Sequence, residues 1–323
     1  MPKPKIAITM GDVSGIGPEI IAAAWSEISQ LCEPVVLGHQ VIIDRARELR
    51  HVTEPITAVN CMNDDIINAE CCRVDSRSGH GAFQALVLGI EMARRGDIAA
   101  LVTAPLNKES LHLAGHHYPG HTEILAERCS VTRFSMMLYL AAGENIAGAN
   151  GLAVNHVTLH TSMREAIEQI TVESVFEKSL LIHEFMQSLN VPQPRIGVCS
   201  LNPHAGEGGL FGREEIEIIV PAIEKARAAG LTIEGALPAD TIMVHAKNGH
   251  YDAVVAMFHD QGHIALKLLG MYRAVNITLG LPIIRTSVAH GTAFDKAWQG
   301  VADYRSLVAA VKVAVEMSQQ RKK

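Results

Sequence analysis

Three histidines, His160, His204 and His259, lie in short sequence runs whose residue types suit metal chemistry. Each run follows or ends an apolar stretch that predicts a strand, and α/β proteins keep their active sites at the carboxyl ends of strands. Three neutral imidazoles that converge on one point form a divalent-metal site with positions left open for a substrate. The sequence therefore predicts a metal-assisted enzyme.

Each histidine also has an ordinary interpretation as a surface or hydrogen-bonded core residue, because a chain with 16 histidines places some near glycines by chance. His204 stands in the specific run Asn-Pro-His-Ala-Gly-Glu-Gly-Gly. His259 precedes Asp260, whose carboxylate could accept a hydrogen bond from the imidazole and orient it. His160 has the weakest local context, and His156 is an alternative ligand.

Two further groups of residues are suited to binding an anionic ligand. His121 and Thr122 follow Gly120 and supply donors, and a helix beginning here would point backbone N–H groups at an anion. Thr122 could equally be an ordinary N-cap. Arg285 follows an apolar run, so it should be partly buried with an anionic partner: either a substrate phosphate or carboxylate, or a structural ion pair.

Composition narrows the class of protein. The chain has 323 residues, 48% of them hydrophobic, which favours two domains, and its net charge of −6 argues against general nucleic-acid binding. None of the six cysteines forms a C-x-x-C pair, which argues against a disulfide framework or a zinc ribbon. No apolar run approaches the length of a membrane span, and the first residues lack a signal-type apolar region. We therefore expect a cytoplasmic protein without membrane or nucleic-acid partners.

Strand and helix patterns alternate along the chain, which predicts a largely parallel sheet sandwiched between helices. The expected strands are 6–10, 34–38, 98–103, 134–140, 151–154, 195–201 and 251–258. The expected helices start at 18 and cover 40–50, 81–95, 162–187, 214–229 and 304–319, with Pro221 as a possible kink. The glycines at 11–17 do not fit the Rossmann pattern G-x-G-x-x-G, so a nucleotide site must be of another kind.

Several motifs together resemble, in their order, the 4-hydroxythreonine-4-phosphate dehydrogenase family of vitamin B6 synthesis, and they span nearly the whole chain. The motifs are Gly11-Asp12 with 15–19, 120–123, 201–209, 259–262, 276–282 and 284–287. The resemblance implies an α/β fold like that of isocitrate and isopropylmalate dehydrogenases, with two α/β domains and a central cleft. The implied domains are a cofactor-binding domain of 1–128 plus 266–323, and a metal-binding and dimerisation domain of 129–265. It also implies a homodimer with a shared active site.

The resemblance assigns roles to individual residues. It implies one divalent metal (zinc, magnesium, manganese or cobalt) bound by the three histidines, with one ligand crossing from the partner chain. The implied substrate-binding residues are His121, Thr122, Lys267, Asn276 and Arg285. Lys267 and Asp260 are the expected catalytic residues, although Lys267 could instead only hold the substrate. The loop of His290, Gly291, Thr292 and Ala293 is similar to the nicotinamide-dinucleotide loop of these enzymes, which implies NAD, or alternatively NADP.

The chain departs from the family pattern at several positions, including Val13-Ser14, where Pro-Ala is usual, and Ala289, where Asp is usual. Segments 103–108 and 115–120 look more like a second branch of the family, which acts on D-threonate 4-phosphate or D-erythronate 4-phosphate. The expected reaction is NAD(P)-linked oxidation, with decarboxylation, of a 4-phosphorylated four-carbon hydroxy acid. Two rival hypotheses are a phosphate acyltransferase-like enzyme on a related fold and a metal-dependent hydrolase; a binding protein would leave the metal without a purpose.

Overall fold

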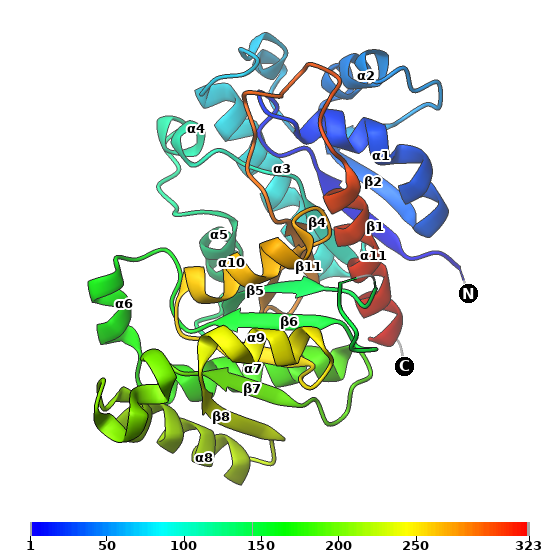
Figure 1. Ribbon diagram of the computed structural model, residues 1–323. Coiled ribbons are helices and arrows are strands. Elements are labelled where there is room, and N and C mark those ends of the chain that lie inside the picture. The colour runs from blue at the N-terminus through cyan, green and yellow to red at the C-terminus, as the bar shows by residue number, and fades with distance from the viewer. Residues whose placement is uncertain (1, 144, 322–323) are drawn as a thin grey trace. The chain divides into compact units, whose positions relative to one another are not determined.

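The computed structural model describes residues 2–143 and 145–321, and the chain divides into two compact units (Figure 1). Unit 1 comprises Met1–Thr132 and Leu281–Lys323, and unit 2 comprises Arg133–Gly280. The segment 266–280, which we expected in the cofactor domain, therefore lies in unit 2. The assignment of a cofactor-binding or metal-binding role to each unit stays a prediction.

The described residues of unit 1 form five parallel strands in the order β3-β2-β1-β4-β11. Their bounds are β1 Lys5–Thr9, β2 Glu33–Gly38, β3 Ala58–Asn60, β4 Ala100–Thr103 and β11 Arg285–Val288. The helices of this unit are α1 Gly17–Leu31, α2 Gln40–Leu49, η1 Asp64–Asn68, α3 Ser76–Arg95, α4 Lys108–Leu113, α5 His121–Cys129 and α11 Arg305–Gln320. α3 packs on β1, β2 and β4, and α11 packs on β4 and β11.

Local sequence explains where the helices of unit 1 begin. α1 has Pro18 in its first turn, where the missing N–H removes no helical hydrogen bond. α3 begins five residues before the expected start at 81, because the side chain of Asp75 accepts a hydrogen bond from the Arg77 N–H and caps the helix. It ends at Gly96, whose φ of 80° is the left-handed conformation that suits glycine.

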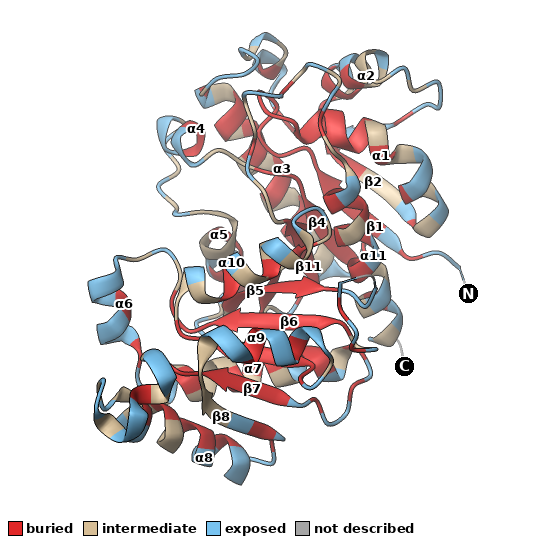
Figure 2. Ribbon diagram, viewed as in Figure 1, coloured by how far each residue is buried: buried red, intermediate tan, exposed pale blue. Residues whose placement is uncertain are grey.

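In unit 2, the part of the chain that the structure describes forms six strands in the order β10-β5-β6-β9-β7-β8. Their bounds are β5 Ser135–Leu140, β6 Leu152–His156, β7 Ile196–Cys199, β8 Ile233–Leu237, β9 Ala253–Ala256 and β10 Val275–Leu279. The pairs β10–β5 and β5–β6 are antiparallel, whereas β6–β9, β9–β7 and β7–β8 are parallel. Both units have mostly buried strands with exposed residues on the outer helices (Figure 2).

Two expected helices of unit 2 differ from the prediction. The helix over 162–187 is two helices, α6 Met163–Gln169 and α7 Val172–Ser188, because Ser162 and Thr171 each form a capping box. The helix over 214–229 is a π-helical turn, η3 Glu215–Ile219, followed by α8 Val220–Ala228. Pro221 lies in the first turn of α8 and does not interrupt it.

The remaining helices of unit 2 are η2 Pro203–Gly209, α9 Ala239–Lys247 and α10 His259–Gly270. α10 packs on β5, β6 and β9, so the residues at its start lie near the ends of these strands. Among the described residues, no helix combines the length and apolar character that crossing a bilayer requires. The expected cytoplasmic location stays a prediction.

Candidate active site

The carboxyl ends of three neighbouring strands in unit 1 carry residues that the sequence singled out. β1 leads into Gly11 and Asp12, β4 leads into Pro105, and β11 leads into His290. The Asp12 N–H donates to the Pro105 carbonyl at 2.9 Å, and Asp12 itself is fully buried. Burial raises the pKa of the Asp12 carboxyl to about 6, although its hydrogen bonds to Ser110 and Ser14 lower it.

Arg285 is the largest fully buried side chain of the described residues. Its Nη2 donates to Thr103 Oγ1 at 2.6 Å, and Thr103 Oγ1 donates to Ser287 Oγ at 3.0 Å. Burial lowers the pKa of Arg285 to about 9, and the nearby Glu123 carboxylate acts in the opposite direction. The prediction that this arginine is buried is thereby confirmed, and a guanidinium at such a site favours an anionic group beside it.

His121 and Thr122 form the first turn of α5, as the sequence predicted. The N-cap of this helix is Gly120, with no side-chain cap, so the alternative that Thr122 is the capping residue is wrong. Burial, and next the charge of Arg285, lower the pKa of His121 well below its usual value. The His121 imidazole is therefore neutral at neutral pH, and one of its ring nitrogens can donate while the other accepts.

The loop of His290, Gly291, Thr292 and Ala293 is fixed at its base and open at its tip. His290 Nε2 lies 2.7 Å from Ser306 Oγ, and the Thr292 carbonyl accepts from the Ile16 N–H at 3.1 Å. A Cβ added to Gly291 would meet no atom within 4 Å, so its backbone is open to a ligand. This geometry fits a dinucleotide loop, whose backbone must approach its ligand closely.

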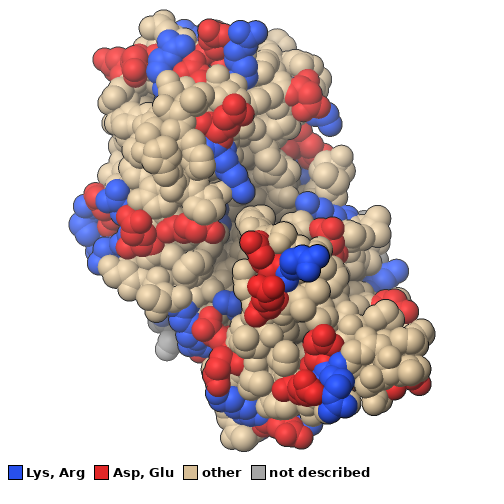
Figure 3. Space-filling model, turned by 90° about the vertical axis from the view of Figure 1, so that its left-hand side faces the viewer, with Lys and Arg blue, Asp and Glu red and all other residues tan. Residues whose placement is uncertain are grey.

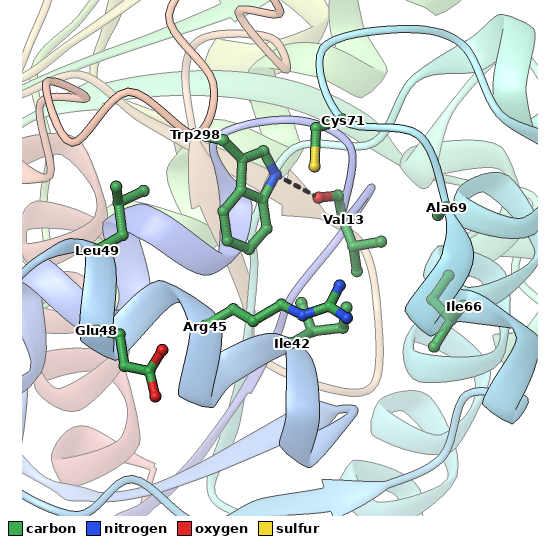
Figure 4. Close-up of a pocket in the computed structure, with 9 residues that line it drawn as sticks. All are labelled: Val13, Ile42, Arg45, Glu48, Leu49, Ile66, Ala69, Cys71 and Trp298. Carbon is green, nitrogen blue, oxygen red and sulfur yellow. Dashed lines mark hydrogen bonds between the residues drawn. The ribbon is translucent and has the colours of Figure 1, made fainter.

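A separate cavity of about 370 Å³ lies in unit 1, between α2 and the loop after η1 (Figure 4). Trp298 forms one wall, and its indole Nε1 donates to the Val13 carbonyl at 2.9 Å. Cys71 points into the cavity, and the Arg45 side chain extends across it. None of the residues predicted to bind metal, substrate or cofactor lines this cavity, so the cavity is separate from those sites.

The three predicted metal ligands of unit 2 follow three neighbouring parallel strands. His160 follows β6, His259 follows β9 and His204 follows β7. The ring centroids of His160 and His259 are 6.0 Å apart. His259 Nδ1 lies 2.7 Å from the Asp260 carboxylate, which leaves Nε2 for a metal. One chain thus brings two of the three imidazoles together.

The segment of His204 is a short left-handed turn. Residues 204–208 have φ between 44° and 75°. Its start is held by the buried Glu215, whose Oε1 accepts from the backbone N–H groups of Leu201 and Asn202, both at 2.8 Å. The His204 ring lies 6.4 Å from that of Phe211. Across residues 2–143 and 145–321, no three His, Cys, Asp or Glu side chains form a group able to hold a metal.

His156, the alternative ligand, is fully buried as the last residue of β6, and its Nε2 lies 3.1 Å from His263 Nδ1. This contact occupies Nε2 of His156 but not its Nδ1, so the choice between His156 and His160 as a metal ligand stays a prediction. Sequence reasoning missed His263, and it included Gln261 in the motif 259–262 without giving it a role. Gln261 accepts from the Met257 N–H at 2.7 Å and donates to the Ser200 carbonyl at 2.8 Å, which ties together the segments after β9 and β7.

Two other predicted residues of unit 2 lie on α10 and β10. Lys267 is two helical turns after His259, on the same face of α10, and is partly exposed. Asn276 lies on β10, and its buried Oδ1 has no hydrogen-bond partner within the described part of the chain. Because buried amide oxygens are normally bonded, this atom is suited to a ligand donor.

A family model described as "Pyridoxal phosphate biosynthetic protein PdxA" matches residues 30–314. The chain belongs to this family. It is 44% identical to the putative D-threonate 4-phosphate dehydrogenase of Oceanobacillus iheyensis, with 98% of each chain covered. It is 42% identical to the D-threonate 4-phosphate dehydrogenase of Salmonella typhimurium, with 97% of this chain and 98% of the relative covered. The resemblance to the 4-hydroxythreonine-4-phosphate dehydrogenase family and the dehydrogenase class, both predicted from the sequence, are therefore confirmed.

A solved structure of a related dehydrogenase has the same fold. The 4-hydroxythreonine-4-phosphate dehydrogenase of Klebsiella pneumoniae is 39% identical, covers 98% of each chain and has a TM-score of 0.85. The α/β fold class that we predicted is confirmed. A branched-chain phosphotransacylase from Enterococcus faecalis, at 13% identity and a TM-score of 0.53, shares the fold alone. That likeness gives the acyltransferase alternative no functional support.

Proposed function

We propose that this dehydrogenase oxidises D-threonate 4-phosphate with NAD(P)⁺ and that the product is decarboxylated. The net reaction oxidises the secondary alcohol β to the carboxylate to a ketone and transfers its hydride to the nicotinamide. The resulting β-keto acid then releases CO₂. The pair of His160 and His259 beside Asp260 is the observation that carries the proposal, because it provides a partly built metal site in a dehydrogenase of this family. The names of the relatives support the choice of substrate.

His160 and His259 of one subunit would hold the metal together with His204 of a second subunit. Imidazole donors fit zinc or cobalt, whereas manganese and magnesium are less suited because they prefer oxygen ligands. When bound, such a metal polarises the substrate hydroxyl as a Lewis acid. The exposed turn of His204 supports its assignment as the ligand that crosses, since it is presented on the surface of unit 2.

The other predicted residues would bind and orient the substrate. Arg285 and the neutral His121 would contact the phosphate or carboxylate, with Thr122 donating from the first turn of α5. The amide of Asn276, whose Oδ1 is buried, would contact a substrate hydroxyl. Lys267 would either bind the carboxylate or transfer a proton, and the loop of His290 would fix the nicotinamide dinucleotide.

A homodimer with a shared site is part of this proposal. Among its described residues unit 2 exposes ten large apolar side chains, and three of these, Ile264, Leu268 and Met271, follow one another at helical spacing on or just after α10, as expected of a surface that a partner covers. The ten are Met163, Ile167, Leu210, Phe211, Ile216, Val244, Ile264, Leu268, Met271 and Tyr272. Charged side chains of both signs are interspersed on the face shown in Figure 3, without a continuous basic patch there.

The decisive experiment assays the metal-loaded enzyme side by side with D-threonate 4-phosphate, D-erythronate 4-phosphate and 4-hydroxythreonine 4-phosphate. NADH or NADPH formation and CO₂ release are measured with each cofactor, and phosphate release tests for hydrolysis. We expect the highest kcat/KM with D-threonate 4-phosphate and loss of turnover in His204→Ala. Phosphate release without nicotinamide reduction would contradict the proposal, as would an active His204→Ala variant that contains no metal.

A further inference from the structure

Two histidines that the proposed reaction does not use form a buried pair beside His259. His156 ends β6 and is fully buried, and His263 is 6% exposed in the second turn of α10. His263 Nδ1 lies 3.1 Å from His156 Nε2. The His263 ring also stacks on the ring of His259: their centroids are 3.8 Å apart and their planes differ by 12°. The core is thereby connected to a proposed metal ligand through two imidazoles.

The local sequence produces this arrangement. His259 and His263 are four residues apart, so their side chains lie on the same face of α10. Gly262 lets α10 approach β6, because a Cβ at this position would lie 2.4 Å from His156 Nε2. Any larger residue at 262 would force the helix and strand apart and would break the hydrogen bond between the rings.

His263 is not itself placed to share a metal ion with His259. The lone pairs of ring nitrogens lie in the ring plane, and metal–nitrogen bonds are about 2 Å long. Two nearly parallel rings stacked 3.8 Å apart have lone pairs in two separate planes, which do not meet at one ion. The stack can therefore orient the His259 ring without competing for its metal.

We propose that His156 and His263 are positioning residues for the metal site. The stacked His263 ring fixes the orientation of the His259 imidazole. The hydrogen bond between His263 and His156 in turn fixes the rotation of the His263 ring. Together with Asp260, which bonds the Nδ1 edge of His259, the pair leaves this ligand little freedom to rotate. The inference rests on the proposed function, because it takes His259 as a metal ligand. Pre-orientation of this kind raises metal affinity by removing the cost of ordering the ligand on binding.

The test measures Zn²⁺ affinity of the full-length, metal-stripped protein by calorimetry, with Co²⁺ absorption spectra as an independent readout of ligand geometry. His156→Leu removes the hydrogen bond, whereas His156→Gln keeps a polar atom near the Nε2 position. His263→Asn keeps a polar atom near Nδ1 but removes the stacked ring. His250→Asn, at an exposed histidine after α9, is the matched control. Thermal unfolding shows whether each variant is folded.

We expect His156→Leu and His263→Asn to weaken Zn²⁺ binding about tenfold or more and to change the Co²⁺ spectrum. His156→Gln and His250→Asn should bind within about twofold of wild type. Wild-type affinity in both His156→Leu and His263→Asn would overturn the inference and leave the proposed function standing. If His156→Leu does not fold, the comparison of His263→Asn with His156→Gln decides. A wild-type protein that binds no metal and yet oxidises the substrate would overturn the metal site and this inference together.

Discussion

The guanidinium Nη2 of Arg285 donates a hydrogen bond to Oγ1 of Thr103 at 2.6 Å, between the neighbouring parallel strands β11 and β4. Both residues are buried, and the Thr103 hydroxyl also donates to Ser287. This relay fixes a cation beside the first turn of α5, where the proposed substrate contacts His121 and Thr122 lie. The hydroxyl of Thr103 therefore helps to determine the position of the Arg285 guanidinium.

Thr103→Val tests this role. Valine has nearly the same shape but leaves one buried N–H of Arg285 without this acceptor, which costs roughly 1–3 kcal/mol of unfolding free energy. We also expect the KM for the phosphorylated acid to rise several-fold with little change in kcat, because the cation is no longer fixed. Thr103→Ser keeps the hydroxyl and serves as the control. Equal stability and equal KM in Thr103→Val and wild type would show that the bond is unimportant.

Glu215→Gln should loosen the turn that carries His204. The Glu215 carboxylate accepts hydrogen bonds from two backbone N–H groups and from Asn202 Nδ2. In glutamine one of the two carboxylate oxygens is replaced by an NH₂ group, which cannot accept a hydrogen bond. The expected loss is roughly 1–3 kcal/mol of unfolding free energy, together with weaker Zn²⁺ binding. The exposed Glu217, which pairs with Arg213, gives the control Glu217→Gln. A Glu215→Gln protein with unchanged metal affinity would separate this carboxylate from the site.

The buried carboxyl of Asp12 should make stability decrease as pH rises. Its pKa is raised to about 6 in the folded protein, so the folded state binds the proton more tightly than the unfolded state does. The corresponding stability is present below about pH 4 and is lost as pH rises through 6, on the order of 2–3 kcal/mol. Asp12→Asn should remove this part of the pH dependence in urea unfolding, whereas Asp65→Asn, at an exposed site, should not. Parallel pH profiles for Asp12→Asn and wild type would contradict the raised pKa.

Leu268→Glu should disrupt the proposed homodimer. Leu268 is 82% exposed on α10, near the exposed Ile264 and Met271, and a carboxylate buried in an interface is strongly unfavourable. Light scattering coupled to size-exclusion chromatography should show a dimer for wild type and a shift toward monomer for the variant, with weaker metal binding. Leu113→Glu places the same charge on a 63% exposed leucine of unit 1 and should remain dimeric. A monomeric wild-type protein would exclude the shared site.

The sequence alone determined the strand-and-helix alternation, the placement of the three histidines after strands, and the family. These features depend on local patterns and motif order. Periodicity marks the strands, and parallel strands bring their carboxyl ends to the same edge of a sheet, so the sequence alone singles out His160, His204 and His259. The burial of Arg285 followed in the same way from its position after an apolar run.

Only the tertiary structure decided which residues surround those histidines. The pairing of His156 with His263 depends on the approach of α10 to β6, a contact between residues that are 107 positions apart in sequence. The break between α6 and α7 depends on capping hydrogen bonds of Ser162 and Thr171, which compete with a continued helix and which periodicity does not register. Side-chain contacts of this kind are set by the packing of distant segments, and therefore His263 carried no signal in the sequence.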